Sequence, residues 1–152
     1  MHDGVEQRIR RRLRLERGNM KTVNVVAAVI CNDINNKTRI FATQRGYGDF
    51  KDGWEFPGGK IEEGETPDEA LVREIKEELD TEIEVHDLID IVDYDYETFH
   101  LHMYCFWATI ISGKLSLLEH ESAAWLSVRT IDNVDWLPAD LGLVEKIKSE
   151  LR

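Results

Sequence analysis

The chain has 152 residues, a hydrophobic content of 42% and a formal net charge of −11. These values are typical of a single globular domain with one hydrophobic core, and no apolar run is long enough to span a membrane. Because the acidic surface repels the phosphate backbone of DNA or RNA, the charge excludes a polymeric nucleic acid as the expected partner.

The acidic charge is unevenly distributed along the chain. Residues 1–19 carry six Arg against three acidic residues, which leaves −14 for the remaining residues. This segment lacks the apolar centre of a secretory signal, so we expect a cytoplasmic protein. We interpret residues 1–19 as a basic extension and residues 20–152 as one domain, and the alternative is a basic arm that touches a partner. Two cysteines in apolar runs, Cys31 and Cys105, are expected to be buried thiols.

Two extended segments open the expected domain. Residues 22–30, TVNVVAAVI, have the β-branched and apolar character of a strand buried on both faces. A turn at residues 34–38, INNKT, predicts a hairpin in which residues 39–45 pair with that first strand. A glycine-rich loop, GYGDFKDG, then leads to the extended segment WEFPGGK.

A helix is expected from Pro67 to about Asp80. Thr66 can cap its first turn, Pro67 suits the first helical position, and Glu69 completes a capping box. The apolar stripe that would bury one side of this helix consists of Leu71, Ile75 and Leu79.

The rest of the chain alternates strands with a final helix. Residues 82–92, 99–111 and 123–128 have strand character, and residues 139–151 form an amphipathic helical pattern. The apolar residues expected on one face of that helix are Leu141, Val144, Ile147 and Leu151. Mixed strands flanked by helices predict an α+β or layered α/β/α domain.

Three carboxylates of the first helix stand at positions that share one face. Glu74, Glu77 and Glu78 are spaced i, i+3 and i+4, so their Cβ atoms lie about 5–6 Å apart. Like charges at this spacing destabilise an isolated helix, and a hard cation would relieve the repulsion. Oxygen ligands suit Mg²⁺, with Mn²⁺ as the alternative. A merely solvated acidic face is the competing interpretation.

The complete pattern around these residues resembles the Nudix box, G-x5-E-x7-R-E-U-x-E-E-x-G-U, in which U is aliphatic. The matching positions are Gly59, Glu65, Arg73, Glu74, Ile75, Glu77 and Glu78. Two positions differ, because the second-last glycine is Asp80 and the last aliphatic residue is Thr81. Aspartate tolerates the left-handed conformation better than most residues, so the helix can still end there.

The resemblance extends over about residues 23–151, because ATQR, WEFPGGKIE and WLPAD are similar to segments of the MutT group. It implies an α/β/α sandwich with a mixed β-sheet and an Mg²⁺-dependent enzyme. That enzyme would hydrolyse a nucleoside triphosphate to the monophosphate and pyrophosphate, and so remove modified nucleotides such as 8-oxo-dGTP or cytosine nucleotides. A monomer or homodimer without membrane contact is expected. The alternatives are hydrolysis of another diphosphate, such as ADP-ribose, and a non-catalytic ligand sensor.

The resemblance also assigns roles at the metal site. The implied ligands are the carboxylates of Glu74, Glu77 and Glu78 with the carbonyl oxygen of Gly58. Glu74 matches a position often proposed as the base for the attacking water. Glu119 is a further candidate ligand or base, and its alternative is an exposed loop residue. An ion pair of Arg73 with Glu65 or Glu77 would orient the ligands.

Four residues are expected to contact the substrate. Arg45 and Lys60 would meet the phosphates, and Phe56 would supply a stacking face unless it belongs to the core. Asp140 matches a neighbourhood that contacts the base. An ionised Asp140 would accept a hydrogen bond from the amine of cytosine, whereas a protonated Asp140 would donate one to the O6 of a purine. Asp140 could also serve as the N-cap of the last helix.

Overall fold

The computed structural model describes residues 20–46, 48–118 and 120–152. The prediction of a basic extension at residues 1–19 lies outside this part of the chain, and so does Glu119. None of the helices in the described part of the chain combines the length and the apolar character that crossing a bilayer requires.

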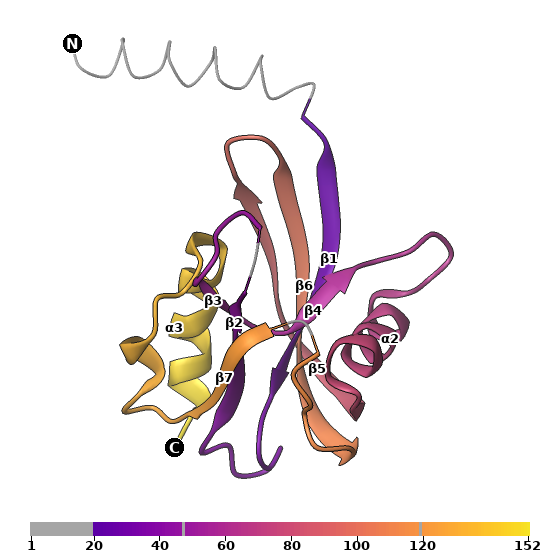
Figure 1. Ribbon diagram of the computed structural model, residues 1–152. Coiled ribbons are helices and arrows are strands. Elements are labelled where there is room, and N and C mark those ends of the chain that lie inside the picture. The colour runs from indigo at the N-terminus through magenta and orange to yellow at the C-terminus, as the bar shows by residue number, and fades with distance from the viewer. Residues whose placement is uncertain (1–19, 47, 119) are drawn as a thin grey trace, which may run out of the picture.

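The elements alternate much as the sequence predicts (Figure 1). The strands are β1 (Thr22–Ile30), β2 (Ile40–Arg45), β3 (Trp54–Glu55), β4 (Gly58–Lys60), β5 (Glu82–Asp95), β6 (His100–Ser112) and β7 (His120–Leu126). The helices are α2 (Pro67–Leu79) and α3 (Leu141–Glu150), and two 3₁₀ turns are η1 (Ile131–Asn133) and η2 (Pro138–Asp140).

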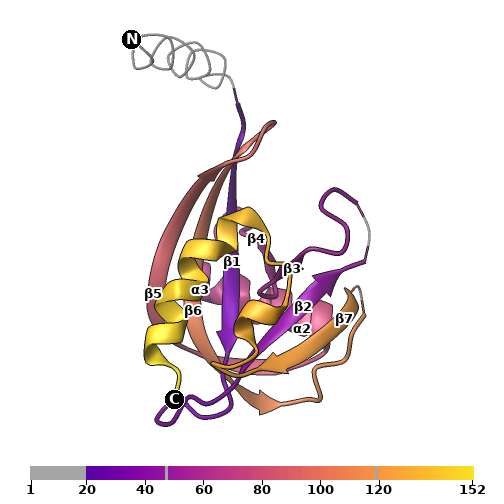
Figure 2. The ribbon, with the colours of Figure 1, turned by 90° about the vertical axis from the view of Figure 1, so that its left-hand side faces the viewer.

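The larger sheet is mixed and lies between the two helices. Its strand order is β4-β1-β6-β5, with β1 parallel to β6 and the other pairs antiparallel. Figures 1 and 2 show α2 and α3 on opposite faces of this sheet. A smaller antiparallel sheet has the order β3-β2-β7. The predicted α+β sandwich with a mixed β-sheet is therefore confirmed.

Strand β1 contributes to the hydrophobic core on both of its faces. Val26 and Ala28 pack in the cluster that includes the apolar residues of α2. Ala27 and Val29 pack in the cluster that includes α3. Since successive side chains of a strand point to opposite faces, a strand between two helical layers needs apolar residues at consecutive positions. The prediction of burial on both faces is thus confirmed for residues 26–30, whereas residues 22–25 of β1 are exposed or only partly buried.

The predicted hairpin between β1 and β2 was wrong. Apart from one bridge between Cys31 and Ile40, β2 pairs with β3 and β7 in the smaller sheet. Both edges of β1 are already occupied, one by β4 and the other by β6. A tight turn brings two segments close, but it does not decide which sheet the second segment joins.

Helix α2 begins and ends as its sequence predicts. The hydroxyl group of Thr66 accepts a hydrogen bond from the backbone N–H of Glu69 at 3.4 Å, and Pro67 opens the helix. Asp80 ends it in the left-handed conformation, with φ 48° and ψ 43°. The backbone N–H of Asp80 donates to the carbonyl oxygen of Lys76, so aspartate fills the place of the glycine in the box.

Helix α3 buries a slightly different stripe from the one predicted. Leu141 is 54% exposed, whereas Leu143 is fully buried with Val144 and Ile147. Residues two apart on a helix point about 200° from one another, so Leu141 and Leu143 cannot share a face. The expected placement of Leu141 in the core was therefore wrong. Both cysteines are free and buried, as predicted.

Candidate active site

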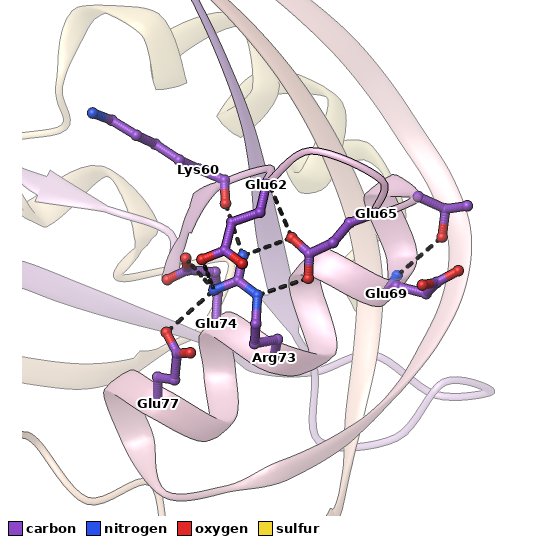
Figure 3. Close-up of polar contacts among 8 residues, drawn as sticks. Lys60, Glu62, Glu65, Glu69, Arg73, Glu74 and Glu77 are labelled. Carbon is purple, nitrogen blue, oxygen red and sulfur yellow. Dashed lines mark hydrogen bonds and ion pairs between the residues drawn. The ribbon is translucent and has the colours of Figure 1, made fainter.

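Arg73 connects the acidic residues of α2 to the loop before the helix (Figure 3). Its Nε atom donates to Oε2 of Glu65 at 2.7 Å, and its Nη2 atom donates to Oε1 of Glu65 at 2.8 Å. The Nη1 atom donates to Glu74 at 2.8 Å and to Glu77 at 3.2 Å. The ion pair that the sequence predicts for Arg73 is therefore present with both expected partners.

The same guanidinium group also holds strand β4 against the helix. Nη2 of Arg73 donates to the carbonyl oxygen of Lys60 at 3.0 Å. Only 22% of the Arg73 side chain is exposed, so these charge-assisted hydrogen bonds are partly shielded from water. Arg73 thereby fixes the position of β4 relative to Glu74 and Glu77.

Hydrogen bonds to Glu65 lower the pKa of its carboxyl group. Those from Arg73, with a further one from the backbone N–H of Glu62, lower the pKa of Glu65 from 4.5 to about 2. The ionised form of Glu65 is thus favoured in the folded protein far into the acid range.

We expect Glu65→Gln to flatten the acid limb of the stability profile. Between pH 4.5 and about 2 the native state binds fewer protons at Glu65 than the unfolded state does. The stabilisation is therefore complete above pH 4.5 and is lost as the pH falls toward 2. Thermal melts across this range would measure it, with the exposed Glu63→Gln as the control. An acid limb as steep in Glu65→Gln as in the wild type would contradict the assignment.

Two glycines allow β4 to lie close to its neighbours. A Cβ atom on Gly58 would overlap the carbonyl oxygen of Val26, and one on Gly59 would overlap the carboxylate of Glu74. Any side chain at these two positions would displace β1 or Glu74. The glycines therefore form a cradle in which backbone atoms of β4 and the carboxylate of Glu74 adjoin.

The chemistry of the donor atoms around this cradle suits a hard divalent cation, but their present arrangement does not. Glu74, Glu77 and Glu78 supply carboxylate oxygens, Gly58 supplies a backbone carbonyl, and Oε2 of Glu78 is shielded from solvent. In the described residues no group of three His, Cys, Asp or Glu side chains is arranged to hold a metal ion. Instead, Arg73 bridges Glu74 and Glu77. Cation binding would need these two carboxylates to turn from Arg73.

A cavity of about 630 Å³ adjoins the cradle. The wall residues that the sequence predicts as substrate or metal contacts are Arg45, Phe56, Gly58, Lys60, Glu78 and Asp140. The wall includes neither Glu74 nor Glu77. The structure therefore joins the four predicted substrate-binding residues and two predicted metal ligands in one cavity, while Glu119 stays a prediction.

Asp140 lies at the end of η2 and is only 4% exposed. It stands at the N-cap position of α3, but its side chain makes no capping hydrogen bond, so the interpretation as a cap was wrong. Burial raises the pKa of Asp140 well above its ordinary value; the negative charge of Glu55 adds to this, and Arg45 opposes it. These effects favour a protonated carboxyl group that can donate a hydrogen bond.

Arg45 and Phe56 each have a structural role in the cavity wall. Arg45 donates through Nε and Nη2 to the two carboxylate oxygens of Glu55, at 2.7 and 3.2 Å. The ring of Phe56 is 3% exposed and stacks on Trp136 at a centroid distance of 4.7 Å. Phe56 therefore belongs to the core and lines the cavity, while its role as a stacking face for a base stays a prediction.

The sequence reasoning missed several residues of the cavity wall. Glu55 faces Arg45, and the hydroxyl group of Tyr96 accepts a hydrogen bond from the backbone N–H of Ala139 at 3.3 Å. The ring of Tyr96 packs between Phe50 and Phe99, at centroid distances of 4.9 and 5.1 Å. The aromatic residues between β5 and β6 were the available signal, and they form an apolar wall beside Asp140.

The comparison with known families decides the identity of this fold. The NUDIX domain family matches residues 22–146 of the chain. The chain belongs to this family. As Nudix hydrolases generally need a divalent cation and act on nucleotides, the oxygen-rich cradle and the adjoining cavity correspond to requirements of the family.

Relatives of this Nudix chain belong to the MutT-like group, which confirms the predicted resemblance. The chain is 39% identical over 97 residues to an 8-oxo-dGTP diphosphatase of Proteus vulgaris, covering 63% of this chain and 84% of the relative. It is 33% identical over 127 residues to a CTP pyrophosphohydrolase of Escherichia coli K12, covering 83% and 91%. The solution structure of the E. coli ORF135 protein superposes with a TM-score of 0.72 and 32% identity, covering 87% of this chain and 92% of that one.

Proposed function

We propose that this Nudix hydrolase is an Mg²⁺-dependent pyrophosphohydrolase of nucleoside triphosphates with a preference for 8-oxo-dGTP. The reaction consumes one water and yields the nucleoside monophosphate and pyrophosphate. The observation that carries the preference is the buried carboxyl group of Asp140 in the cavity that also reaches Glu78 and Gly58. The 8-oxo-dGTP diphosphatases among the relatives support it.

The phosphate end of the site is built from α2 and β4. Glu74, Glu77, Glu78 and the carbonyl oxygen of Gly58 would hold the cation, which supplies charge neutralisation at the phosphates. Lys60 lines the same end of the cavity and offers a positive charge to a phosphate oxygen. Arg73 fixes β4 against the helix, so Gly58 and Lys60 are held in place, whereas Glu74 and Glu77 would turn from Arg73 when the cation binds.

The base end of the site is formed around Asp140. A carboxyl group that stays protonated can donate a hydrogen bond to a carbonyl oxygen, and the O6 atom of a purine is such an acceptor. Phe56 and the ring of Tyr96 line the cavity beside it and offer apolar surface to the base. An ionised Asp140 would instead accept a hydrogen bond from the amine of cytosine. The CTP pyrophosphohydrolase among the relatives supports this second candidate.

A screen of pyrophosphate release with Mg²⁺ tests the proposal. The panel holds 8-oxo-dGTP, dGTP, CTP, dCTP, 5-hydroxy-dCTP and ADP-ribose. A clear preference for 8-oxo-dGTP would support the proposal, and a preference for the cytosine nucleotides would assign the site to the ionised form of Asp140. Hydrolysis of ADP-ribose alone would refute the base pocket. Cytoplasmic location and a monomeric or homodimeric state stay predictions.

We expect Asp140→Leu, which keeps the branched shape of the side chain but removes its hydrogen-bond donor, to change the choice of base more than the phosphate chemistry. The ratio of kcat/KM for 8-oxo-dGTP to that for dCTP should fall about 10-fold, the effect of one hydrogen bond to a base edge. In the wild type this ratio should also fall as rising pH removes the proton of Asp140, whereas the variant should show no such step. An equal loss on every base would give Asp140 a purely structural role.

A further inference from the structure

Glu55 lies in the wall of the cavity, and the function proposed above gives it no contact with the substrate. It occupies β3, where its backbone is paired with Thr43 of β2, and 22% of its side chain is exposed. The hydroxyl group of Thr43 is directed to the carbonyl oxygen of Glu55 at 3.4 Å. Placing a carboxylate in the wall of a mostly apolar cavity costs free energy unless the charge is paired. The partner of Glu55 and its remaining hydrogen-bonding capacity therefore decide what this residue can do.

Arg45 holds the Glu55 carboxylate in one orientation. The guanidinium group donates to both carboxylate oxygens, and its Nη1 atom donates to the carbonyl oxygen of Asp49 at 3.2 Å. Because β2 and β3 are paired strands, the two side chains sit on a common rigid support. Each carboxylate oxygen has two acceptor positions, so Glu55 can still accept a hydrogen bond from a ligand.

Glu55 and Asp140 lie close enough to influence one another. Burial has the largest effect on the pKa of Asp140 and raises it. The negative charge of Glu55 raises this pKa further, while the positive charge of Arg45 lowers it. A negative charge on Asp140 would also act on Tyr96 and Cys105, where it favours the neutral hydroxyl and thiol groups. The cavity therefore contains one carboxylate that can only accept and one carboxyl group that can donate. Such a division of roles between two carboxyl groups is typical of recognition and catalytic sites.

We propose that Glu55 determines the specificity for an oxidised purine by accepting a hydrogen bond from its N7–H group, while Asp140 donates to O6. The proposal rests on the function proposed above. In guanine N7 is an acceptor on the same base edge as O6. Oxidation at C8 gives the 8-oxo form, in which N7 carries a hydrogen. Glu55 would attract the N7–H of the oxidised base and repel the N7 lone pair of the normal base.

A comparison of nucleotides that differ at N7 tests this role. The substrates are 8-oxo-dGTP and 7-deaza-8-oxo-dGTP, in which a CH₂ group replaces N7–H, and both are given to the wild type and to Glu55→Gln. In the wild type we expect kcat/KM to be at least about 10-fold higher for 8-oxo-dGTP, the range of one hydrogen bond to a charged group. In Glu55→Gln the ratio should fall below about 3-fold, because the charge that favours N7–H is gone. The exposed Glu84→Gln is the matched control and should keep the wild-type ratio.

The alternative is that Glu55 merely holds Arg45. In that case Glu55→Gln lowers kcat/KM for both nucleotides equally, which would overturn the proposal. Equal kcat/KM values of the wild type for the two nucleotides would also overturn the proposal. This outcome needs no variant, so the proposal can be tested even if Glu55→Gln does not fold. Failure of the proposed function looks different, since the wild type would then prefer a cytosine nucleotide to 8-oxo-dGTP or release no pyrophosphate from any triphosphate. Glu55→Asp, which keeps the charge, should retain a ratio between those of the wild type and Glu55→Gln.

Discussion

Glu78→Gln should lower kcat for pyrophosphate release by at least about 100-fold while the protein stays folded, and Glu77→Gln should behave similarly. The substitution keeps the shape of the side chain but removes the negative charge that a hard cation requires. Loss of several kcal/mol of charge stabilisation at the phosphates corresponds to a change of this size. The measurement is single-substrate kinetics at saturating Mg²⁺, together with a titration of Mn²⁺ binding.

The control for these variants is Glu69→Gln on the same helix. Glu69 is exposed in the first turn of α2, and glutamine also fits its place in the capping box. We expect wild-type kinetics for this control. Near-normal turnover in both Glu77→Gln and Glu78→Gln would remove the metal-site interpretation and leave α2 with a solvated acidic face.

Arg73→Met should affect both stability and turnover. It removes the hydrogen bonds that join Arg73 to Glu65, Glu74, Glu77 and the carbonyl oxygen of Lys60, and it leaves several carboxylates without their shared counter-charge. We expect Tm to fall by about 5 °C and kcat to fall about 10- to 100-fold, because groups that orient metal ligands typically contribute this much. Differential scanning calorimetry and initial-rate kinetics measure the two effects.

The matched control for Arg73→Met is Lys76→Met. Lys76 is an exposed cation of the same helix, and its ion pair is with Asp80 at 3.2 Å, away from the cradle. The control should change Tm by only a degree or two, as is usual for an exposed ion pair, and should leave kcat unchanged. If Arg73→Met kept wild-type turnover at every Mg²⁺ concentration, a role in positioning the ligands would be refuted.

The features of α2 could be predicted because their causes are local. Thr66, Pro67 and Asp80 act on backbone groups within one turn of themselves, so the sequence around them contains the whole explanation. The shared side of Glu74, Glu77 and Glu78 follows from helical spacing alone. Their side-chain orientations do not, because Arg73 competes for two of these carboxylates, and that competition depends on where β4 lies.

Other features could not be predicted because they depend on contacts between distant segments. The partners of β2 were decided by β4 and β6, which occupy both edges of β1. The burial of Asp140 depends on how η2 packs over the cavity, and the position of Glu55 depends on the pairing of β2 with β3. No local pattern distinguishes these residues from exposed acidic residues, which are far more common.

Strand β5 forms an outer edge of the larger sheet, and its composition bears on how the protein avoids aggregation. Among the described residues no strand pairs with the outer side of β5, and a strand of 14 residues with an unpaired edge is a template for intermolecular pairing. Its acidic residues are Glu82, Glu84, Asp87, Asp90, Asp93 and Asp95. Its pairing with β6 is also irregular at three places, and such bulges twist an edge away from a flat partner. Two such edges would repel each other through their negative charges, and the irregular backbone would pair poorly. Both effects disfavour pairing of β5 between two molecules, although this long strand lies at the surface.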